Sequence, residues 1–394
     1  MSGPLAGFKV VDFSAVISGP LATMLLADQG ADVVKVEASG RPDLLRKEWY
    51  WRGGLTSMFT NVNRGKRSIV VDLHTEGGLD VVQRLVREAD VVVENFRPGV
   101  AERIGIGPEA LFALNPRLVV CRITGYGATG PRSKQRAYDP VIQGSTGFVA
   151  IQKNPEVPIP DLVRNALVDK ACSYTAAQAI TAALLARERG AGGQTIEVPM
   201  IDAGLAFFWP DGMMKHTFLG EGVREGPALY ERYHLSETKD GHVVMWAGSD
   251  PEWHALFRAL GRPELCVDPR FERGGARVEN GEELSAILQA EFRSRTTEEL
   301  VGQMRDEDVP GGPVLSLEEI FDDSQIVHNG KIVEREHETA GRLRECAPAA
   351  RFSKSVTELP PLAPLLGEHT DEVLTELGFD APAVAALREG QAVA

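Results

Sequence analysis

The clearest indication of the fold lies near the start of the sequence, in Phe8-Lys-Val-Val-Asp-Phe13, Gly19-Pro20, Leu21–Gln29 and Ala31-Asp-Val-Val-Lys-Val-Glu37. Its two valine-rich runs are short and rich in β-branched residues, which is typical of strands. The residues between them have helical spacing, after a break at Gly19-Pro20. A strand, a helix and a second strand in this order predict the first unit of a parallel sheet.

The same alternation continues downstream. Further strands are predicted at Ser68–Leu73, Asp90-Val-Val-Val-Glu-Asn95 and Arg117-Leu-Val-Val-Cys-Arg122, with a helix from about Gly77 to Glu88. Short apolar strands between helices favour a parallel sheet that is covered on both faces. We therefore expect an α/β protein whose large domain is Rossmann-like.

The loop after the first strand lacks the glycines of a dinucleotide site. It reads Ser14-Ala-Val-Ile-Ser-Gly-Pro20, without GxGxxG. This argues against a NAD-dependent oxidoreductase. The function must therefore be inferred from other residues and not from the fold class.

The chain is long enough for two domains. After Asp202 the periodicity is lost, and a new unit begins at Gly241-His-Val-Val-Met-Trp246, with helices near Pro251–Leu260 and Glu282–Phe292. The segment Pro361–Ala394 is helical again but too short to fold alone. The predicted divisions are the large domain at 1–205, a linker at 206–224, a small α/β domain at 225–315, a linker at 316–340 and a C-terminal segment at 341–394.

Bulk composition excludes several classes of protein. The net charge of -14 argues against a nucleic-acid binder. The cysteines and histidines show no metal-ligand spacing, which predicts a reduced, cytoplasmic protein without a structural metal. His254 on a helix and His369 in a turn before a C-terminal helix are expected to be structural. Neither a signal peptide nor a membrane-spanning segment is expected.

Asp169 is the strongest candidate for chemistry. It lies in Asn165-Ala-Leu-Val-Asp-Lys170, just before the alanine-rich stretch Ala176–Ala186, which predicts a helix. The partial positive charge of a helix N-terminus can hold such a carboxylate ionised. It can then act as a nucleophile toward an activated acyl group. The alternative is an aspartate that only caps the helix.

An ordered set of segments resembles one family, the class III CoA-transferases, which include formyl-CoA transferase, carnitine CoA-transferase and the bile-acid-inducible CoA-transferase. The resemblance extends from about residue 4 to 380. The segments are Asp12-Phe-Ser14, Gly19-Pro20, Gly30–Glu37, Asn63-Arg-Gly-Lys-Arg-Ser68, Asp90–Gly99, Gly125-Tyr-Gly127, Gly130-Pro131, Tyr138-Asp139, Asp169, Gly193-Gln194, Asp202-Ala203, Val309-Pro-Gly-Gly-Pro313 and Leu366-Gly-Glu-His-Thr370.

The resemblance implies a fold, an assembly and a reaction. It implies a C-terminal segment that returns to the large domain, and two chains threaded through each other as an interlocked-ring homodimer. Asp169 would be the nucleophile that moves CoA from an acyl-CoA donor to a carboxylic acid acceptor, with no permanently bound cofactor. By resemblance, the CoA site would be lined by Val16, Ile17, Leu73, Thr75, Asn95, Phe96, Arg103, Ile104, Arg136 and Tyr138.

CoA carries phosphates, which arginine and lysine bind well. For each candidate, a solvated surface role is the alternative. The candidates are Arg64, Lys66, Arg67, Arg97, Arg103 and Arg136.

The same superfamily contains α-methylacyl-CoA racemases, which use a histidine and an aspartate as an acid–base pair. The histidine would fall at position 138, where this chain has Tyr138. A tyrosine with its pKa near 10 is a poor general base at neutral pH, which favours the transferase. A non-enzymatic CoA-binding protein is a further alternative, but it would not need a carboxylate at position 169.

The chain departs from formyl-CoA transferase before Trp246, where no tetraglycine loop is present. This disfavours oxalate and formate and favours a larger acyl group. Four residues are candidates for the border of the acyl pocket, with core packing as the alternative: Met200, Phe207, Phe208 and Trp209.

Overall fold

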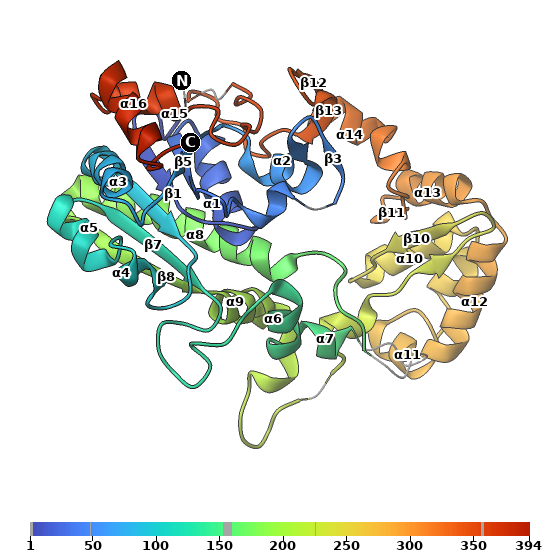
Figure 1. Cartoon of the computed structure of the whole chain (residues 1–394). Helices are drawn as coiled ribbons and strands as arrows, with labels where there is room; N and C mark the ends of the chain where they lie inside the picture. Colours follow the sequence, from blue (N-terminus) through green and yellow to red (C-terminus); the bar gives the residue numbers. More distant parts are fainter. Residues whose placement is uncertain (1–2, 48, 153–159, 225, 356–357) are drawn as a thin grey trace. The chain divides into compact units, whose positions relative to one another are not determined.

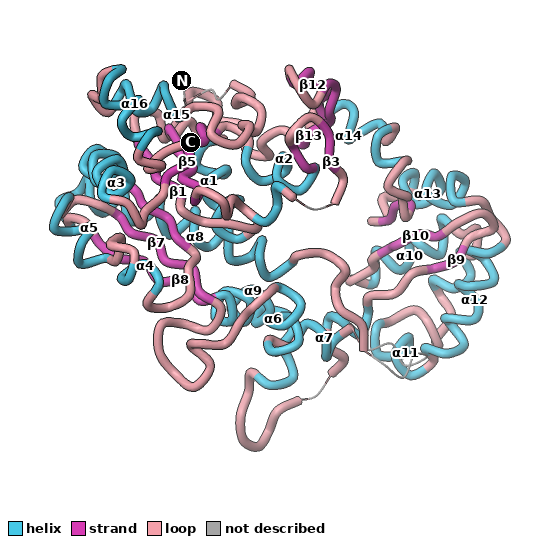
Figure 2. The backbone as a smooth tube through the Cα atoms, viewed as in Figure 1, coloured by secondary structure: helices cyan, strands magenta, loops and turns pink. Residues whose placement is uncertain are grey.

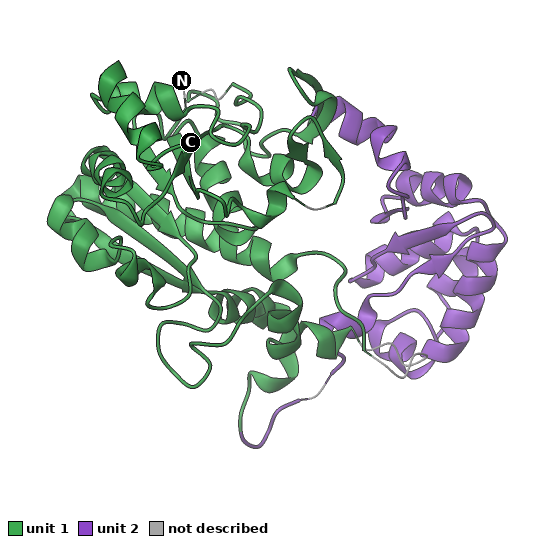
Figure 3. Cartoon of the chain, in the orientation of Figure 1, with its two compact units in different colours: residues 1–219, 331–394 green, residues 220–330 purple. Residues whose placement is uncertain are grey.

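The computed structural model describes residues 3–47, 49–152, 160–224, 226–355 and 358–394. The chain forms two compact units (Figure 3). The larger unit comprises residues 1–219 and 331–394, and the smaller comprises residues 220–330. The smaller unit contains the predicted range 225–315 and extends beyond it at both ends.

A six-stranded sheet forms the centre of the larger unit (Figures 1 and 2). All its strand pairs are parallel. β2 and β5 lie on one side of β1, and β6, β7 and β8 lie on the other side, as in doubly wound sheets. The prediction of an α/β fold with a parallel sheet is confirmed. In spatial order the strands are β5 (Lys66–Val71), β2 (Asp32–Ala38), β1 (Lys9–Asp12), β6 (Val91–Glu94), β7 (Val119–Thr124) and β8 (Gln194–Pro199).

Alternate side chains of the strands enter two different cores. Val91 and Val93 pack on one face of the sheet, and Val92 packs on the other. Both faces are apolar, which explains the continuous valine runs in the sequence. The first face is covered by α1 (Ser18–Ala27), α6 (Asp139–Ser145), α8 (Leu167–Ala186) and α9 (Met200–Gly212), and the second by α3 (Glu76–Glu88), α4 (Val100–Arg103), α5 (Pro108–Leu114), α15 (Thr370–Glu376) and α16 (Ala381–Glu389).

Several predicted bounds shift. Helix α1 starts at Ser18 and not at Leu21, so that Gly19-Pro20 lies inside its first turn. Proline is tolerated there because its missing N–H has no partner within the helix. Strand β8 was not predicted, because its short, half-polar sequence resembles a loop. Helix α8 begins at Leu167, well before the alanine-rich part.

The C-terminal segment packs on the sheet of the larger unit. Val373 and Leu374 of α15 belong to the second core. At the very end of the chain, Val393 forms an antiparallel bridge with Val71 of β5. In Figure 1, α15 and α16 accordingly lie beside β5 and α3. The hairpin of β12 (Ile332–His337) and β13 (Gly341–Cys346) precedes this segment.

The smaller unit has an antiparallel three-stranded sheet and its own apolar core. The predicted helices near 251–260 and 282–292 are present as α10 and α12. Within the described parts of the chain, no helix is both long and apolar enough to cross a membrane. The elements of this unit are β9 (Ser236–Glu237), β10 (His242–Met245), α10 (Asp250–Ala259), α11 (Gly274–Glu279), α12 (Gly281–Arg293), α13 (Thr297–Asp306), β11 (Gly311–Pro313) and α14 (Ser324–Asn329).

Candidate active site

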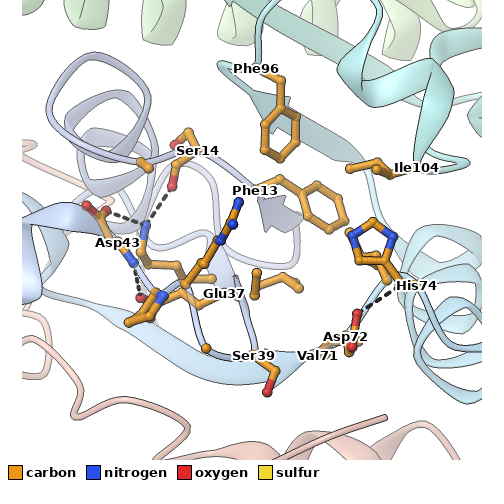
Figure 4. Close-up of a pocket in the computed structure, with 18 residues that line it drawn as sticks. Phe13, Ser14, Glu37, Ser39, Asp43, Val71, Asp72, His74, Phe96 and Ile104 are labelled. Carbon is orange, nitrogen blue, oxygen red and sulfur yellow. Dashed lines mark hydrogen bonds and ion pairs between the residues drawn. The ribbon is translucent and has the colours of Figure 1, made fainter. Parts of the chain in front are cut away.

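A pocket of about 590 Å³ lies at the carboxyl ends of β1, β2, β5 and β6. This is the edge of a doubly wound sheet where ligands usually bind, at the point where the strand order reverses. One wall is formed by Phe13, Phe96 and Ile104. Figure 4 shows these apolar side chains together, with the Asp43 carboxylate on the opposite side of the pocket.

The polar wall rests on buried ion pairs. Lys35 Nζ lies 3.1 Å from Asp43 Oδ2, and Lys66 Nζ lies 2.9 Å from Asp12 Oδ2. Burial opposes ionisation of Asp12, but Lys66 and Lys35 hold its pKa below the usual range. Each buried charge has a partner of opposite sign, which offsets the free-energy cost of removing the charges from water.

The loop between β1 and α1, residues 13–17 (the β1–α1 loop), is held on several sides. The Asn95 side chain accepts from the Ala15 N–H at 2.9 Å and donates to the Ala15 carbonyl at 2.7 Å. The Val16 N–H donates to both Asp43 oxygens, at 3.1 and 3.3 Å. Lys35 Nζ donates to the Ser14 carbonyl at 2.7 Å. The backbone of this loop is therefore fixed by side chains from β2 and from the segments that follow β2 and β6.

Asp169 lies in the first turn of α8 and is only 8% exposed. Its carboxylate makes no hydrogen bond or ion pair among the described residues. The position is inside the helix and not at its cap, because Ala166 occupies the cap position. A largely buried residue whose carboxylate stays unpaired and keeps contact with solvent marks a candidate functional group.

The cap of α8 comes from another helix. Asp139, the first residue of α6, accepts from the Val168 and Asp169 N–H groups at 2.7 and 3.0 Å. The Gln143 side chain donates to the other Asp139 oxygen at 2.5 Å and to the Asn165 carbonyl at 3.1 Å. Asp139 thus takes the place of an N-cap side chain that the sequence of α8 lacks.

The surroundings of Asp169 favour its protonated form. Burial, with the nearby charge of Asp139, raises the pKa of Asp169 to about 7. This opposes the ionised state expected from the helix N-terminus alone. A carboxyl group with its pKa near neutrality is suited to gaining and losing charge in a reaction.

The predicted CoA-lining residues lie in several places. Leu73, Phe96 and Ile104 line the pocket. Val16 and Ile17 are half-buried in the β1–α1 loop and are not among the lining residues, because they pack on the apolar cluster that contains Leu21 and Phe59.

Two predicted CoA-lining residues use their polar groups within the protein. The Thr75 hydroxyl caps α3, because it accepts from the Gly78 N–H at 3.0 Å. The same hydroxyl donates to the Asp72 carbonyl. The Asn95 amide is occupied by Ala15.

Three of the proposed phosphate ligands form ion pairs within the chain, which favours a structural role for them. Arg64 pairs with Asp28, and Lys66, with no exposed side-chain surface, pairs with Asp12. Arg67 pairs with Asp32 and with two glutamates of α15. The sequence could not show this, because each partner is distant in the chain.

The other proposed ligands remain available. Arg97, Arg103 and Arg136 are exposed and form no ion pair with any described residue. Arg103 lies at the end of α4, directly before Ile104 of the pocket. Tyr138 is 56% exposed and lies in the loop that enters α6.

The four candidates for the border of the acyl pocket all lie in α9, where two are buried and two are exposed. Met200 and Phe208 are buried in the first core, where Phe208 packs edge-on against Phe148. These two residues therefore follow the core alternative. Phe207 and Trp209 are 58% and 46% exposed.

Two histidines, His254 and His369, have the structural contacts that were expected of them. His254 Nε2 contacts the Glu272 carbonyl at 3.0 Å, and His369 accepts from the Ser68 N–H at 3.3 Å. No cluster of metal-ligating side chains occurs in the described residues.

Sequence reasoning missed Asp43 and the cap function of Asp139. Asp43 follows β2 and so lies at the carboxyl edge of the sheet, a signal that was available. The contact of Asp139 with α8 had no signal in the chain, because it joins residues of two separate helices.

Comparisons with known proteins point to one family. Residues 5–370 match the model of CoA-transferase family III. Succinyl-CoA:glutarate CoA-transferase of Mus musculus is 34% identical over 389 residues, covering 97% of this chain and 88% of the mouse protein. Formyl-CoA:oxalate CoA-transferase of Escherichia coli is 31% identical over 423 residues and is covered, like this chain, to 100%.

A solved structure agrees with these sequence matches. The crystal structure of a CAIB/BAIF family protein from Brucella suis superposes with a TM-score of 0.83 at 32% identity. The match covers 96% of this chain and 100% of that protein. The similarity thus includes both sequence and fold over nearly the whole chain.

Proposed function

Because the chain belongs to CoA-transferase family III, we propose that it moves CoA from an acyl-CoA to a small carboxylic acid, with Asp169 as the covalent nucleophile. The observation that carries this proposal is Asp169, a largely buried residue in the first turn of α8 whose carboxylate has no hydrogen-bond or ion-pair partner among the described residues and whose oxygens keep contact with solvent.

The first half of the reaction moves CoA onto the protein. The Asp169 carboxylate attacks the thioester carbonyl and the C–S bond breaks, so that CoA leaves as a thiolate and the acyl group stays on Asp169 as a mixed anhydride. The thiolate then attacks the aspartyl carbonyl of the anhydride. The donor acid leaves as a carboxylate, and Asp169 carries CoA as a thioester.

The second half reverses these steps with a new acid. The acceptor carboxylate attacks the aspartyl thioester, which releases the CoA thiolate and forms a second mixed anhydride between the acceptor and Asp169. The thiolate attacks the acceptor acyl carbonyl, which forms the new acyl-CoA and restores the Asp169 carboxylate. Burial of Asp169 helps these steps, because water would hydrolyse either anhydride.

The pocket at the carboxyl edge of the sheet is the proposed CoA site. Phe13, Phe96 and Ile104 offer apolar surface for the adenine ring. Arg103, which directly precedes Ile104 and has no ion-pair partner among the described residues, is the proposed phosphate ligand. The relatives named above act on glutarate and oxalate, which supports small acids as the substrate class here.

The finer assembly is also a proposal. Residues 370–394 pack on the large unit although residues 220–330 of the smaller unit intervene in the chain. Such a closed path is compatible with two chains linked as rings. We therefore infer an interlocked homodimer.

The nucleophile is tested by trapping. The protein is incubated with a panel of acyl-CoAs and free acids, and CoA exchange is followed by mass spectrometry. Hydroxylamine should then leave a hydroxamate on the peptide that contains Asp169. Asp169→Asn should lower turnover by several orders of magnitude, because an amide is far less nucleophilic.

The matched control is Glu76→Gln. Glu76 also lies in the first turn of a helix, but it is exposed. Its variant should keep both turnover and label. A hydroxamate on another residue, or normal turnover by Asp169→Asn, would exclude Asp169 as the nucleophile.

A further inference from the structure

We propose that Asp43 is a positioning residue for acyl transfer, because it holds the β1–α1 loop in a strained conformation that fixes the start of α1 beside Asp169. This inference rests on the proposed role of Asp169 as nucleophile. It assigns a function to a carboxylate that does not itself take part in bond formation.

The strain lies at Val16, whose φ is 69°. This left-handed conformation is unfavourable for a β-branched residue. Such residues keep it only where surrounding contacts over-determine the backbone, and they cluster at functional sites. Here the Val16 N–H donates to both oxygens of Asp43, and Asn95 clamps the preceding residue through both its N–H and its carbonyl.

Asp43 is itself firmly anchored. It is 4% exposed, and its own N–H donates to Glu37 Oε1 at 3.1 Å. Its Oδ2 pairs with Lys35, and the same lysine donates to the Ser14 carbonyl. The two side chains therefore hold the loop at two points, the Ser14 carbonyl and the Val16 N–H.

The held loop connects to Asp169 through buried hydrogen bonds. Ser18 begins α1, two positions after Val16, and its carbonyl accepts from Ser173 Oγ at 2.8 Å. The Ser173 hydroxyl also lies 2.7 Å from the Asp169 carbonyl, one turn earlier in α8. If Val16 relaxed to a negative φ, the peptide before Ser18 would rotate. The start of α1 would then shift relative to the turn that carries Asp169.

The close packing of the loop leaves little room for other conformations. A Cβ on Gly19 would come within 2.3 Å of the Ser14 hydroxyl oxygen and closer still to its Cβ. The loop thus folds back directly on the first turn of α1. A change of backbone conformation at Val16 must move that turn with it.

A double-mutant cycle tests the proposal. Asp43→Asn is made with Val or Gly at position 16, and the rate of hydroxamate formation at Asp169 is measured in a single turnover. Glycine adopts a positive φ without steric cost, so the loop then needs Asp43 less. We expect Asp43→Asn to slow the reaction at least about tenfold more with Val16 than with Val16→Gly.

Two further variants complete the design. Asn95→Ala releases the loop from the β6 side and should show the same dependence on residue 16, which keeps the test valid if Asp43→Asn does not fold. Asp28→Asn breaks a buried ion pair with Arg64 that does not touch the loop. Its effect on the rate should be the same with Val or Gly at position 16.

The outcomes separate this inference from the proposed function. An equal effect of Asp43→Asn and Asn95→Ala in both backgrounds, or no effect in either, overturns the positioning role. A purely structural loss would lower thermal stability without any coupling of the rate to residue 16. Asp169→Asn, run in the same assay, should abolish the label. If the label persists, the proposed function has failed, whatever the cycle shows.

Discussion

At the scale of the residue, burial and reactivity oppose each other at Asp169. The nucleophile must be ionised, but burial and the charge of Asp139 raise its pKa to about 7. We predict that kcat/KM rises with pH up to about 7 and levels off above it. Below that pH the rate should fall about tenfold per unit, because only the ionised fraction reacts. A pH–rate profile of the wild-type protein measures this.

Asp139→Asn provides the control for the cause of the shift. It removes the negative charge next to Asp169 but leaves burial, the larger cause, in place. The acid limb of the profile should move to lower pH while staying above the usual carboxyl range near 4. A limb that does not move would show that the Asp139 charge has no influence on Asp169.

The linked effect on stability has a definite sign. The folded-state pKa of Asp169 lies above its unfolded value, so its contribution is fully present below about pH 4. That contribution is lost as the pH rises through about 7. Asp169→Asn should therefore gain in Tm relative to wild type between pH 4 and 7, and calorimetry across this range should show the gain levelling off above pH 7.

Arg103 allows a test of CoA binding. It is exposed, has no ion-pair partner among the described residues and directly precedes Ile104 of the pocket. Arg103→Ala should weaken CoA binding by about 1.5–3 kcal/mol, the scale of a charged hydrogen bond. Isothermal calorimetry can measure this, with Arg87→Ala as a control on the exposed end of α3. Equal CoA affinities of the two variants would rule out Arg103 as a ligand.

At the scale of the element, helix caps determine several details of the site. Thr75 caps α3 through its hydroxyl, and Asp139 caps α8 from another helix. Each cap satisfies N–H groups that a helix cannot satisfy by itself. The turn that holds Asp169 therefore depends on α6 as well as on α8.

Thr75 allows the cap to be measured. Thr75→Ala should lower the free energy of unfolding by about 1 kcal/mol, because the Gly78 N–H loses its acceptor. Thr75→Ser retains the hydroxyl and should lose much less. Urea unfolding of the two variants gives the comparison. If both lose the same amount, the methyl group and not the hydroxyl is what matters.

At the scale of the whole molecule, the C-terminal segment closes the larger unit. Val373 and Leu374 complete the second core, and Arg67 of β5 pairs with Glu372 and Glu376 of α15. If two chains are linked as rings, they cannot separate while this closure persists. We predict a dimer that survives dilution to nanomolar concentration and dissociates only as it unfolds.

Analytical ultracentrifugation at rising urea concentrations measures this. Loss of the dimer should coincide with loss of secondary structure by circular dichroism. A folded, active monomer at low concentration would contradict the interlocked arrangement.

The fold class follows from the sequence alone, and so does the hypothesis that Asp169 is the nucleophile. The valine runs around Val10, Val33 and Val92 predict strands that are buried on both faces, because a strand with two covered faces needs apolar side chains at every position. Asp169 was found from its place before a helix, and the order of the motifs identified the family. Each of these signals depends on neighbouring residues or on the order of motifs along the chain, and can therefore be recognised without knowing the fold.

Which charged groups are paired and which are exposed becomes visible only in the folded chain. Lys66 and Arg103 are both cations in the sequence, yet Lys66 is buried in an ion pair with Asp12 and Arg103 is exposed. The pKa of Asp169 likewise depends on Asp139 and on burial. Ion pairing, burial and cross-helix caps arise between residues that are distant in the chain, and so their energies appear only when the chain has folded.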